Sequence, residues 1–167
     1  MSNKILVLQT GGTLDKCYPK TILGYAFEIG EPAVSRVLDR VKSSLAVEVK
    51  SVCRLDSQDI RQEDRVKLAG ACRETEVKRI LVTHGTDTML ETADMLSKEQ
   101  LDKIIVLTGS FLPETFKDSD ADFNIGFAIG CLQTMTSIGV YVAMNGCVLP
   151  WSNCRRDSQT NMFGPIE

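Results

Sequence analysis

The feature that most constrains the fold is the alternation of short apolar runs with segments of helical spacing. The runs lie at residues 5–8, 47–52, 80–83, 104–107 and 139–143. Several of them are apolar on both faces, which is typical of strands buried between two layers of helices. The chain is therefore expected to build its core around a buried sheet.

Four segments between these runs carry apolar residues at the spacing of a helix, about 3.6 residues per turn. They cover residues 34–41, 64–76, 89–96 and 122–134. Alternating strands and helices predict a doubly wound α/β fold, with a mainly parallel sheet and helices on both faces. The last stretch, residues 153–167, loses the apolar period and is expected to be a loop or a docking tail.

Composition narrows the classes of function. The 167 residues suit one domain, spanning 1–167, and a net charge of −3 argues against non-specific nucleic-acid binding, which needs a basic face. No stretch approaches the roughly 18 consecutive apolar residues of a membrane span. The first residues lack the pattern of a signal peptide, so we expect a cytoplasmic protein without a membrane partner.

Cysteine and histidine usage bears on metals and bases. The six cysteines form no C-x-x-C pair, and His84 is the single histidine, so a zinc ribbon or a multi-histidine site is not expected. We expect reduced cysteines and no cofactor. His84 stands beside a glycine at a strand end, and we favour a buried, hydrogen-bonded imidazole over a catalytic base.

Small, hydroxylated and acidic residues follow each apolar run. They occupy residues 11–13, 55–59, 83–88, 108–113 and 144–146. In parallel sheets ligands bind outside the carboxyl ends of the strands, so these segments are expected to meet at one edge of the sheet. Their joint placement indicates a site more strongly than any one of them alone.

Each segment also has a structural interpretation. Gly11-Gly12 permits a tight turn, and the spacing of a Walker A loop is missing, so a phosphate cradle is a minor alternative. Thr88 and Glu91 fit a capping box for the following helix, which leaves Thr86 and Asp87 without an assignment. Residues 57–59 also fit an ordinary Asx or Ser turn.

Four motifs together resemble the bacterial-type L-asparaginase/glutaminase family. They are TGGT at 10–13, SQD at 57–59, THGTDTMLETA at 83–93 and LTGS at 107–110. The two threonine signatures occur in the order and separation of that family. The resemblance spans the chain but covers only the N-terminal domain of the family, so the chain resembles a short-chain asparaginase with a flavodoxin-like fold.

The resemblance implies a role for each matching residue. Thr13 matches the threonine that attacks the side-chain amide carbon and forms the acyl-enzyme. Thr86 and Asp87 match the second threonine and its acidic neighbour, placed against the amide and the α-amino group. Ser57 and Gln58 match residues that hold the α-carboxylate and amino group of the substrate.

Two further positions complete this expected site. The regions of Gly12 and Thr86 would offer backbone N–H and hydroxyl donors to the tetrahedral oxyanion. The family carries a loop tyrosine that helps to activate the nucleophile. Tyr18 is the preferred match because TGGTLDKCY is compact, and Tyr25 is the fallback.

The chain also departs from the family pattern. The lysine that pairs with Asp87 aligns with Arg156, or alternatively with Arg155, and arginine keeps the charge but does not readily give up a proton. An acidic residue from a neighbouring subunit's C-terminal domain is absent with that domain. Glu167 does not obviously replace it.

The leading hypothesis is hydrolysis of L-asparagine to L-aspartate and ammonia without metal or cofactor, with Tyr18 or an Asp87-linked Thr86 as proton acceptor. One alternative is an asparaginase that also hydrolyses glutamine. Another is a weakly active or non-catalytic amino-acid sensor. A nucleotide-binding domain rests on the Gly-Gly turn alone. We expect a small-molecule amide substrate and a homodimer.

Overall fold

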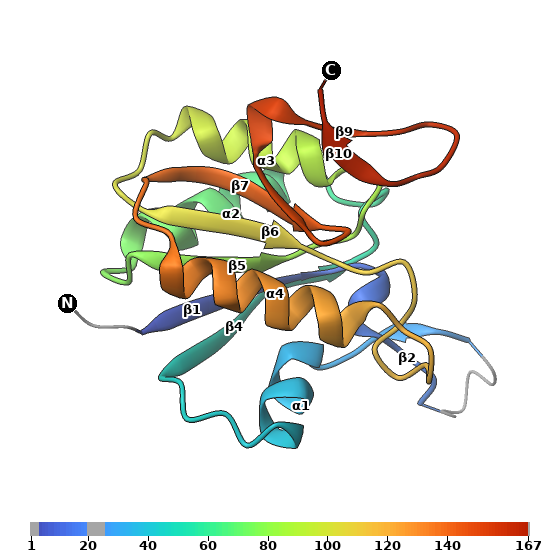
Figure 1. Cartoon of the computed structure of the whole chain (residues 1–167). Coiled ribbons are helices and arrows are strands. Elements are labelled where there is room, and N and C mark those ends of the chain that lie inside the picture. The colour runs from blue at the N-terminus through green and yellow to red at the C-terminus, as the bar shows by residue number, and fades with distance from the viewer. Residues whose placement is uncertain (1–3, 20–25, 167) are drawn as a thin grey trace.

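A computed structural model describes residues 4–19 and 26–166, and it places one sheet between two layers of helices (Figure 1). The strand order is β4-β1-β5-β6-β7-β8. The first five strands in this order run parallel, and β8 is antiparallel to β7. The predicted doubly wound α/β fold is confirmed. The strands are β1 (Ile5–Gly11), β4 (Val47–Leu55), β5 (Arg79–Thr83), β6 (Ile104–Thr108), β7 (Gly139–Met144) and β8 (Cys147–Pro150).

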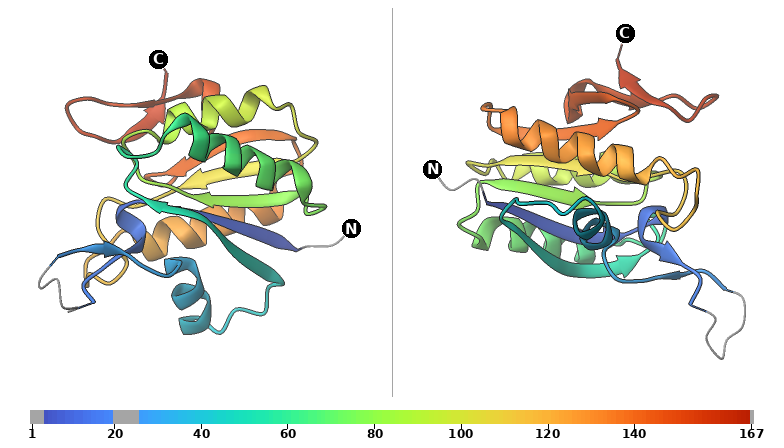
Figure 2. Two further views of the ribbon diagram at one scale, coloured as in Figure 1. Left: turned by 180° about the vertical axis from the view of Figure 1, so that it is seen from behind. Right: turned by 60° about the horizontal axis from the view of Figure 1, so that its bottom comes forward.

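The apolar strands serve two separate cores because successive side chains point to opposite faces of the sheet. Leu6 and Leu8 of β1 belong to the core under α2 (Gln62–Glu74) and α3 (Met89–Lys98). Ile5 and Val7 belong to the core under α1 (Ala33–Arg40) and α4 (Ala121–Thr134). Both layers are visible from behind and from below in Figure 2. Among the described residues, no helix is long and apolar enough to cross a membrane.

The order of the strands creates a switch point beside β1. From β1 the chain passes through α1 to β4 on one side, and from β4 it crosses through α2 to β5 on the other side. The carboxyl ends of β1 and β5 therefore flank the place where the strand order reverses. Ligands in open α/β sheets bind outside the strands at such a place.

Short elements complete the chain around the sheet. The turn η1 (Thr13–Asp15) follows β1 and leads into β2 (Lys16–Cys17), which pairs antiparallel with β3 (Glu28–Ile29). Near the other end, η2 (Trp151–Asn153) precedes β9 (Cys154–Arg156), which pairs with β10 (Phe163–Pro165).

The expectation of a loop or a docking tail over residues 153–167 is wrong for two short segments, β9 and β10, whereas residues 157–162 between them contain no helix or strand. β9 and β10 form an antiparallel hairpin, and Cys154 and Phe163 are buried in the core beneath α2 and α3. Strands of three residues are too short to show a repeating pattern of apolar side chains, so the sequence carried no periodic signal for them.

The predicted capping box at α3 is also wrong. Thr88 occupies the N-cap position, but its hydroxyl donates to the carbonyl oxygen of Ser57 at 2.7 Å. Glu91 pairs with Arg65, with 3.0 Å between Nη2 and Oε2. Both side chains therefore connect α3 to other elements. Their partners in the tertiary structure replace the local capping contacts that the sequence pattern predicted.

A buried lysine closes the carboxyl end of α2. Lys103, just before β6, is 6% exposed, and its ammonium donates to the carbonyl oxygens of Cys72, Arg73 and Thr75. The last two of these contacts measure 3.2 and 2.5 Å. Burial lowers the pKa of Lys103. A cation here interacts favourably with the helix dipole and satisfies carbonyl groups that have no partner within the helix.

We expect Lys103→Met to reduce the free energy of unfolding by about 2–4 kcal/mol, because it leaves these carbonyl oxygens buried without a donor. Urea denaturation monitored by circular dichroism would measure the loss. The matched control is Lys78→Met, which removes an exposed lysine paired with Asp102 at 2.9 Å and should cost about 0.5 kcal/mol or less. Equal losses in the two variants would contradict the assignment.

Candidate functional site

The carboxyl ends of β1, β4 and β5 meet through backbone contacts that only glycine permits. A Cβ atom on Gly12 would lie 2.4 Å from both the nitrogen and the Cα of Gly85. A Cβ atom on Gly85 would lie 2.6 Å from the Cβ of Ser57. Gly12 also has a φ of +84°, which side chains rarely tolerate. The predicted meeting of these strand ends is confirmed.

The contact places two threonines on adjoining turns. Thr13 follows Gly12 and starts η1, and Thr86 follows Gly85 just before α3. Both side chains are partly exposed, and within residues 4–19 and 26–166 no hydrogen bond occupies either hydroxyl. These two hydroxyls are therefore available to a ligand at the edge of the sheet.

One expectation about donors needs correction. The backbone N–H of Gly12 donates to the carbonyl oxygen of Leu55 at 2.9 Å, so this group is engaged within the fold. Gly12 contributes the close approach to Gly85 and not a free donor. The positive φ that turns the chain there also points its N–H toward β4, a consequence that residue type alone does not reveal.

Asp87 is the electrostatic centre of the site. Its Oδ1 accepts from Nη1 of Arg156 at 2.7 Å, and its Oδ2 accepts from Nε2 of Gln58 at 2.7 Å. The hydrogen bond from Arg156, followed by that from Gln58, lowers the pKa of Asp87. The backbone N–H of Asp87 donates to Oγ of Ser57 at 3.3 Å. The structure thus brings together four of the residues that the sequence singled out.

Arg156 is held by two aromatic rings that the sequence analysis missed. Its guanidinium carbon lies 5.7 Å from the ring centroid of Phe111 and 5.8 Å from that of Phe163. Such distances allow a cation–π attraction. Phe111 directly follows the LTGS motif at the end of β6, which was a usable signal, whereas Phe163 lies in the aperiodic tail. Arg155 instead donates to the carbonyl oxygen of Pro165 at 3.3 Å, so Arg156 is the arginine that pairs with Asp87.

Of the two candidate tyrosines, the structure describes Tyr18. Tyr18 follows β2, is 39% exposed, and places its ring centroid 5.4 Å from that of Phe27. Phe27 in turn lies 5.8 Å from Phe116 of the loop between β6 and α4. Tyr25 and Glu167 lie outside the described residues. The role of a loop tyrosine stays a prediction.

His84 is structural, as favoured from the sequence. It is fully buried, and burial lowers its pKa to about 4, so the imidazole is neutral at pH 7. Nε of Arg65 donates to the hydroxyl of Thr92 at 3.0 Å, which lies 2.8 Å from Nε2 of His84. Nδ1 of His84 lies 2.7 Å from the carbonyl oxygen of Gly85. With Thr92 donating to Nε2, the proton on Nδ1 holds the Gly85 carbonyl in place.

Comparison with known proteins places this geometry in a family. The family model described as "Asparaginase, N-terminal" matches residues 4–164. The L-asparaginase of Thermococcus kodakarensis is 36% identical over 145 residues, which is 84% of this chain and 43% of that protein. The "probable L-asparaginase periplasmic" of Haemophilus influenzae is 30% identical over 166 residues, covering 93% of this chain and 47% of that protein.

Solved structures show the same relationship. The thermostable L-asparaginase from Thermococcus kodakarensis has a TM-score of 0.82 and 31% identity, covering 98% of this chain and 51% of its own. A probable cytoplasmic L-asparaginase from Campylobacter jejuni has a TM-score of 0.81 and 25% identity, covering 97% of this chain and 52% of its own.

The chain thus spans about half the length of the relatives that it matches. The names of these relatives include both a periplasmic and a cytoplasmic protein, so a cytoplasmic location stays a prediction. The chain belongs to the asparaginase family, whose N-terminal domain it matches over residues 4–164.

Proposed function

We propose that this chain is an L-asparaginase-type amidohydrolase that converts L-asparagine to L-aspartate and ammonia, with Thr13 as the nucleophile. The observation that supports the proposal is the contact of Gly12 with Gly85 at the switch point of the sheet, since Thr13 and Thr86 directly follow these two glycines. Neither hydroxyl is hydrogen-bonded in the described part of the chain, so each can be directed at a bound substrate.

The proposed reaction proceeds by acyl transfer. Oγ1 of Thr13 attacks the carbonyl carbon of the side-chain amide, its proton passes to a basic group, and ammonia leaves after receiving a proton. Water then attacks the ester and releases aspartate. Tyr18 and the Asp87-linked Thr86 are the two candidates for the proton acceptor.

The oxyanion formed in both steps needs donors aimed at it. Because Leu55 engages the N–H of Gly12, we assign this role to the next groups along the two turns. These are the backbone N–H of Thr13 and the hydroxyl of Thr86.

Asp87 and its neighbours form the proposed binding site for the amino-acid part of the substrate. The ionised carboxylate of Asp87 would attract the α-ammonium group, and Ser57 and Gln58 would bind the α-carboxylate and amino group. Arg156 acts as a fixed cation that keeps Asp87 ionised, since a guanidinium group is not deprotonated in proteins.

Two further candidates follow from specific features. Glutamine is one methylene longer than asparagine, a difference that a pocket discriminates by only about 1–3 kcal/mol, so glutamine hydrolysis is the first competing activity. Arginine at position 156 favours, as a second candidate, an amino-acid sensor that binds without turnover, because a guanidinium group does not readily give up a proton. Calorimetric binding of asparagine or aspartate by a protein that releases no ammonia would support the sensor.

We expect purified protein to release ammonia from asparagine. Thr13→Ala should lower kcat at least about 10³-fold, because it removes the attacking oxygen. Thr86→Ala should lower kcat at least about 10²-fold, because it removes a proton-transfer partner and an oxyanion donor. A coupled ammonia assay, run with asparagine and glutamine in parallel, measures both effects.

The matched control for these two variants is Thr134→Ala, which removes an exposed hydroxyl at the end of α4 and should leave kcat within about twofold. Activity that survives both Thr13→Ala and Thr86→Ala would sink the assignment of the nucleophile.

The pH dependence of KM tests the role of Arg156. Because the folded-state pKa of Asp87 lies below its ordinary 3.8, the ion pair is present above that value and is lost as the pH falls through the lowered pKa. Arg156→Gln removes the largest cause of this shift, so the rise of KM on the acid side should move to higher pH.

Arg156→Lys retains the positive charge and should keep the acid limb closer to that of the natural protein. Arg155→Gln is the matched control beside it in β9. Steady-state kinetics from about pH 3 to about pH 8 would measure KM for all four proteins, a range that extends below the ordinary carboxyl pKa of about 3.9. An unchanged acid limb in Arg156→Gln would contradict this role.

A further inference from the structure

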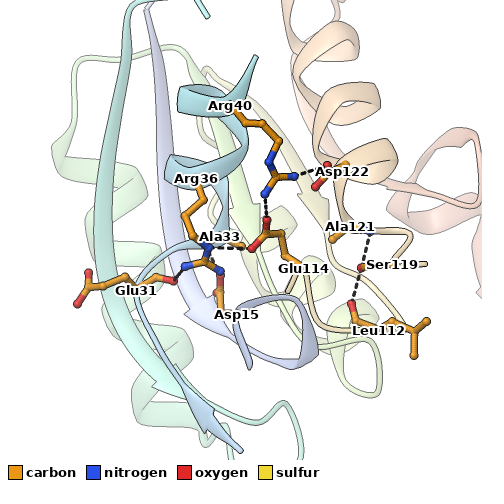
Figure 3. A network of polar contacts seen from close by, with 10 residues as sticks. All are labelled: Asp15, Glu31, Ala33, Arg36, Arg40, Leu112, Glu114, Ser119, Ala121 and Asp122. Carbon is orange, nitrogen blue, oxygen red and sulfur yellow. Dashed lines mark hydrogen bonds and ion pairs between the residues drawn. The ribbon is translucent and has the colours of Figure 1, made fainter. Parts of the chain in front are cut away.

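A buried carboxyl group lies in the turn η1, which begins at Thr13, and Figure 3 shows this group, Asp15, beside Ala33. Asp15, the last residue of η1, is fully buried, and its Oδ1 accepts from the backbone N–H of Ala33 at 2.7 Å. Ala33 is the first residue of α1. The carbonyl oxygen of Asp15 also accepts from the N–H of Gly30 at 2.9 Å. The turn that presents Thr13 is thus attached to the start of α1.

Glu114, in the loop before α4, is also hydrogen-bonded to η1. Its backbone N–H donates to the carbonyl oxygen of Leu14 at 3.2 Å, and its side chain is 2% exposed. Its carboxylate accepts from Nε of Arg36 at 2.7 Å and from Arg40, and Arg40 also pairs with Asp122 at 2.6 Å (Figure 3). Burial raises the pKa of Glu114, but the bonds from Arg36 and Arg40 outweigh it and lower the pKa overall.

Asp15 receives no such ion pair. The two cations that face it are Arg36 of α1 and Arg54 of β4, and each is directed at another carboxylate. Arg36 binds Glu114, and Arg54 binds Glu31 at 2.7 Å.

The amide of Gln9 in β1 donates to the carbonyl oxygen of Gly30 at 2.9 Å, and hydrogen bonding from the same amide favours the charged form of Asp15. Among the described residues, Oδ2 of Asp15 has no hydrogen-bond partner.

The ionised form of Asp15 lowers the free energy of unfolding in this buried environment. Burial raises the pKa of Asp15 to about 6, although the Ala33 N–H, Gln9, Arg36 and Arg54 favour the charged form. An uncharged residue of the same shape would be less costly at neutral pH. Costly titratable groups cluster at functional sites, and this one shares a turn of three residues with Thr13.

We propose that Asp15 is a positioning residue for Thr13: its ionised carboxylate, bound to the N–H of Ala33, holds η1 in the geometry that sets Thr13 against the loop of Gly85 and Thr86. The inference rests on the proposed role of Thr13 as nucleophile. A carboxylate accepts a shorter and stronger hydrogen bond than a neutral carboxyl does, and it is favoured at the first turn of α1.

The proposal predicts that stability and turnover respond oppositely to pH. The pKa of Asp15 rises on folding from 3.8 to about 6. The protonated carboxyl therefore contributes fully to the free energy of unfolding below pH 3.8, and this contribution is lost as the pH rises through about 6. Turnover should instead rise over the same range, because ionisation tightens the turn. A residue that only stabilised the fold would make both quantities change in the same direction.

The test compares the natural protein with Asp15→Asn and Asp15→Ala, by kinetics on asparagine and by melting temperature across the same pH range. We expect kcat of the natural protein to rise with a midpoint near pH 6, a step that Asp15→Asn lacks. The melting temperature of Asp15→Asn relative to the natural protein should increase as the pH rises.

Asp15→Ala, which also loses the acceptor for Ala33, should reduce kcat about 10–100-fold with little change in KM. Asp15→Asn retains that acceptor and should lie between the two. The matched control is Asp122→Asn, at the exposed end of the Glu114 network, which should keep both pH profiles of the natural protein.

The outcomes separate this inference from the proposed function. A folded Asp15→Asn protein with the same kcat step as the natural protein overturns the positioning role, whether or not Asp15→Ala folds. If the natural protein releases no ammonia, the proposed function fails and the inference falls with it. A difference in melting temperature between Asp15→Asn and the natural protein that is constant from pH 4 to 8 also overturns it, since Asp15 would then not titrate near 6.

Discussion

The site depends on the close approach of two backbones, those of Gly12 and Gly85, at the switch point of the sheet. A single Cβ on Gly12 would come within 2.4 Å of the neighbouring chain, so any other residue would push the end of β1 away from the loop after β5. The two threonines that follow these glycines share an edge only because nothing stands between the backbones. The neutral His84 also fixes the loop after β5, because its Nδ1 lies 2.7 Å from the carbonyl oxygen of Gly85.

The charged part of the site is assembled from distant segments. Asp87 and Arg156 are 69 residues apart, and their pairing depends on the hairpin of β9 and β10, whose Phe163 ring lies 6.4 Å from that of Phe111, just after β6. Phe111 and Phe163 give the guanidinium two ring faces, which suits the planar group of arginine better than the compact ammonium of lysine. The surroundings of position 156 therefore suit an arginine.

Much of the architecture was readable from periodicity. The all-apolar run from Ile5 to Leu8 had to be a strand with helices on both faces, and the structure divides its side chains between two cores. The positions of Thr13, Ser57, Thr86 and Asp87 directly after such runs predicted their meeting, since parallel strands end at one edge. The failures were of another kind. The hydroxyl of Thr88 donates to the carbonyl oxygen of Ser57 and does not cap its own helix. The N–H of Gly12 donates to the carbonyl oxygen of Leu55. In both cases the hydrogen-bond partner is distant in the sequence.

The amino-acid sequence by itself determined the order of strands and helices, the faces that they bury, and the residues that stand at the edge of the sheet. These properties follow from short-range spacing, which a single chain displays directly. The tertiary structure decided which groups are free and which are engaged. It placed Arg156 near the rings of Phe111 and Phe163, buried Asp15 in the turn that begins at Thr13 with Oδ2 unpartnered among the described residues, and set Tyr18 against Phe27. Burial and hydrogen-bond direction depend on contacts between distant residues, and no local pattern encodes them.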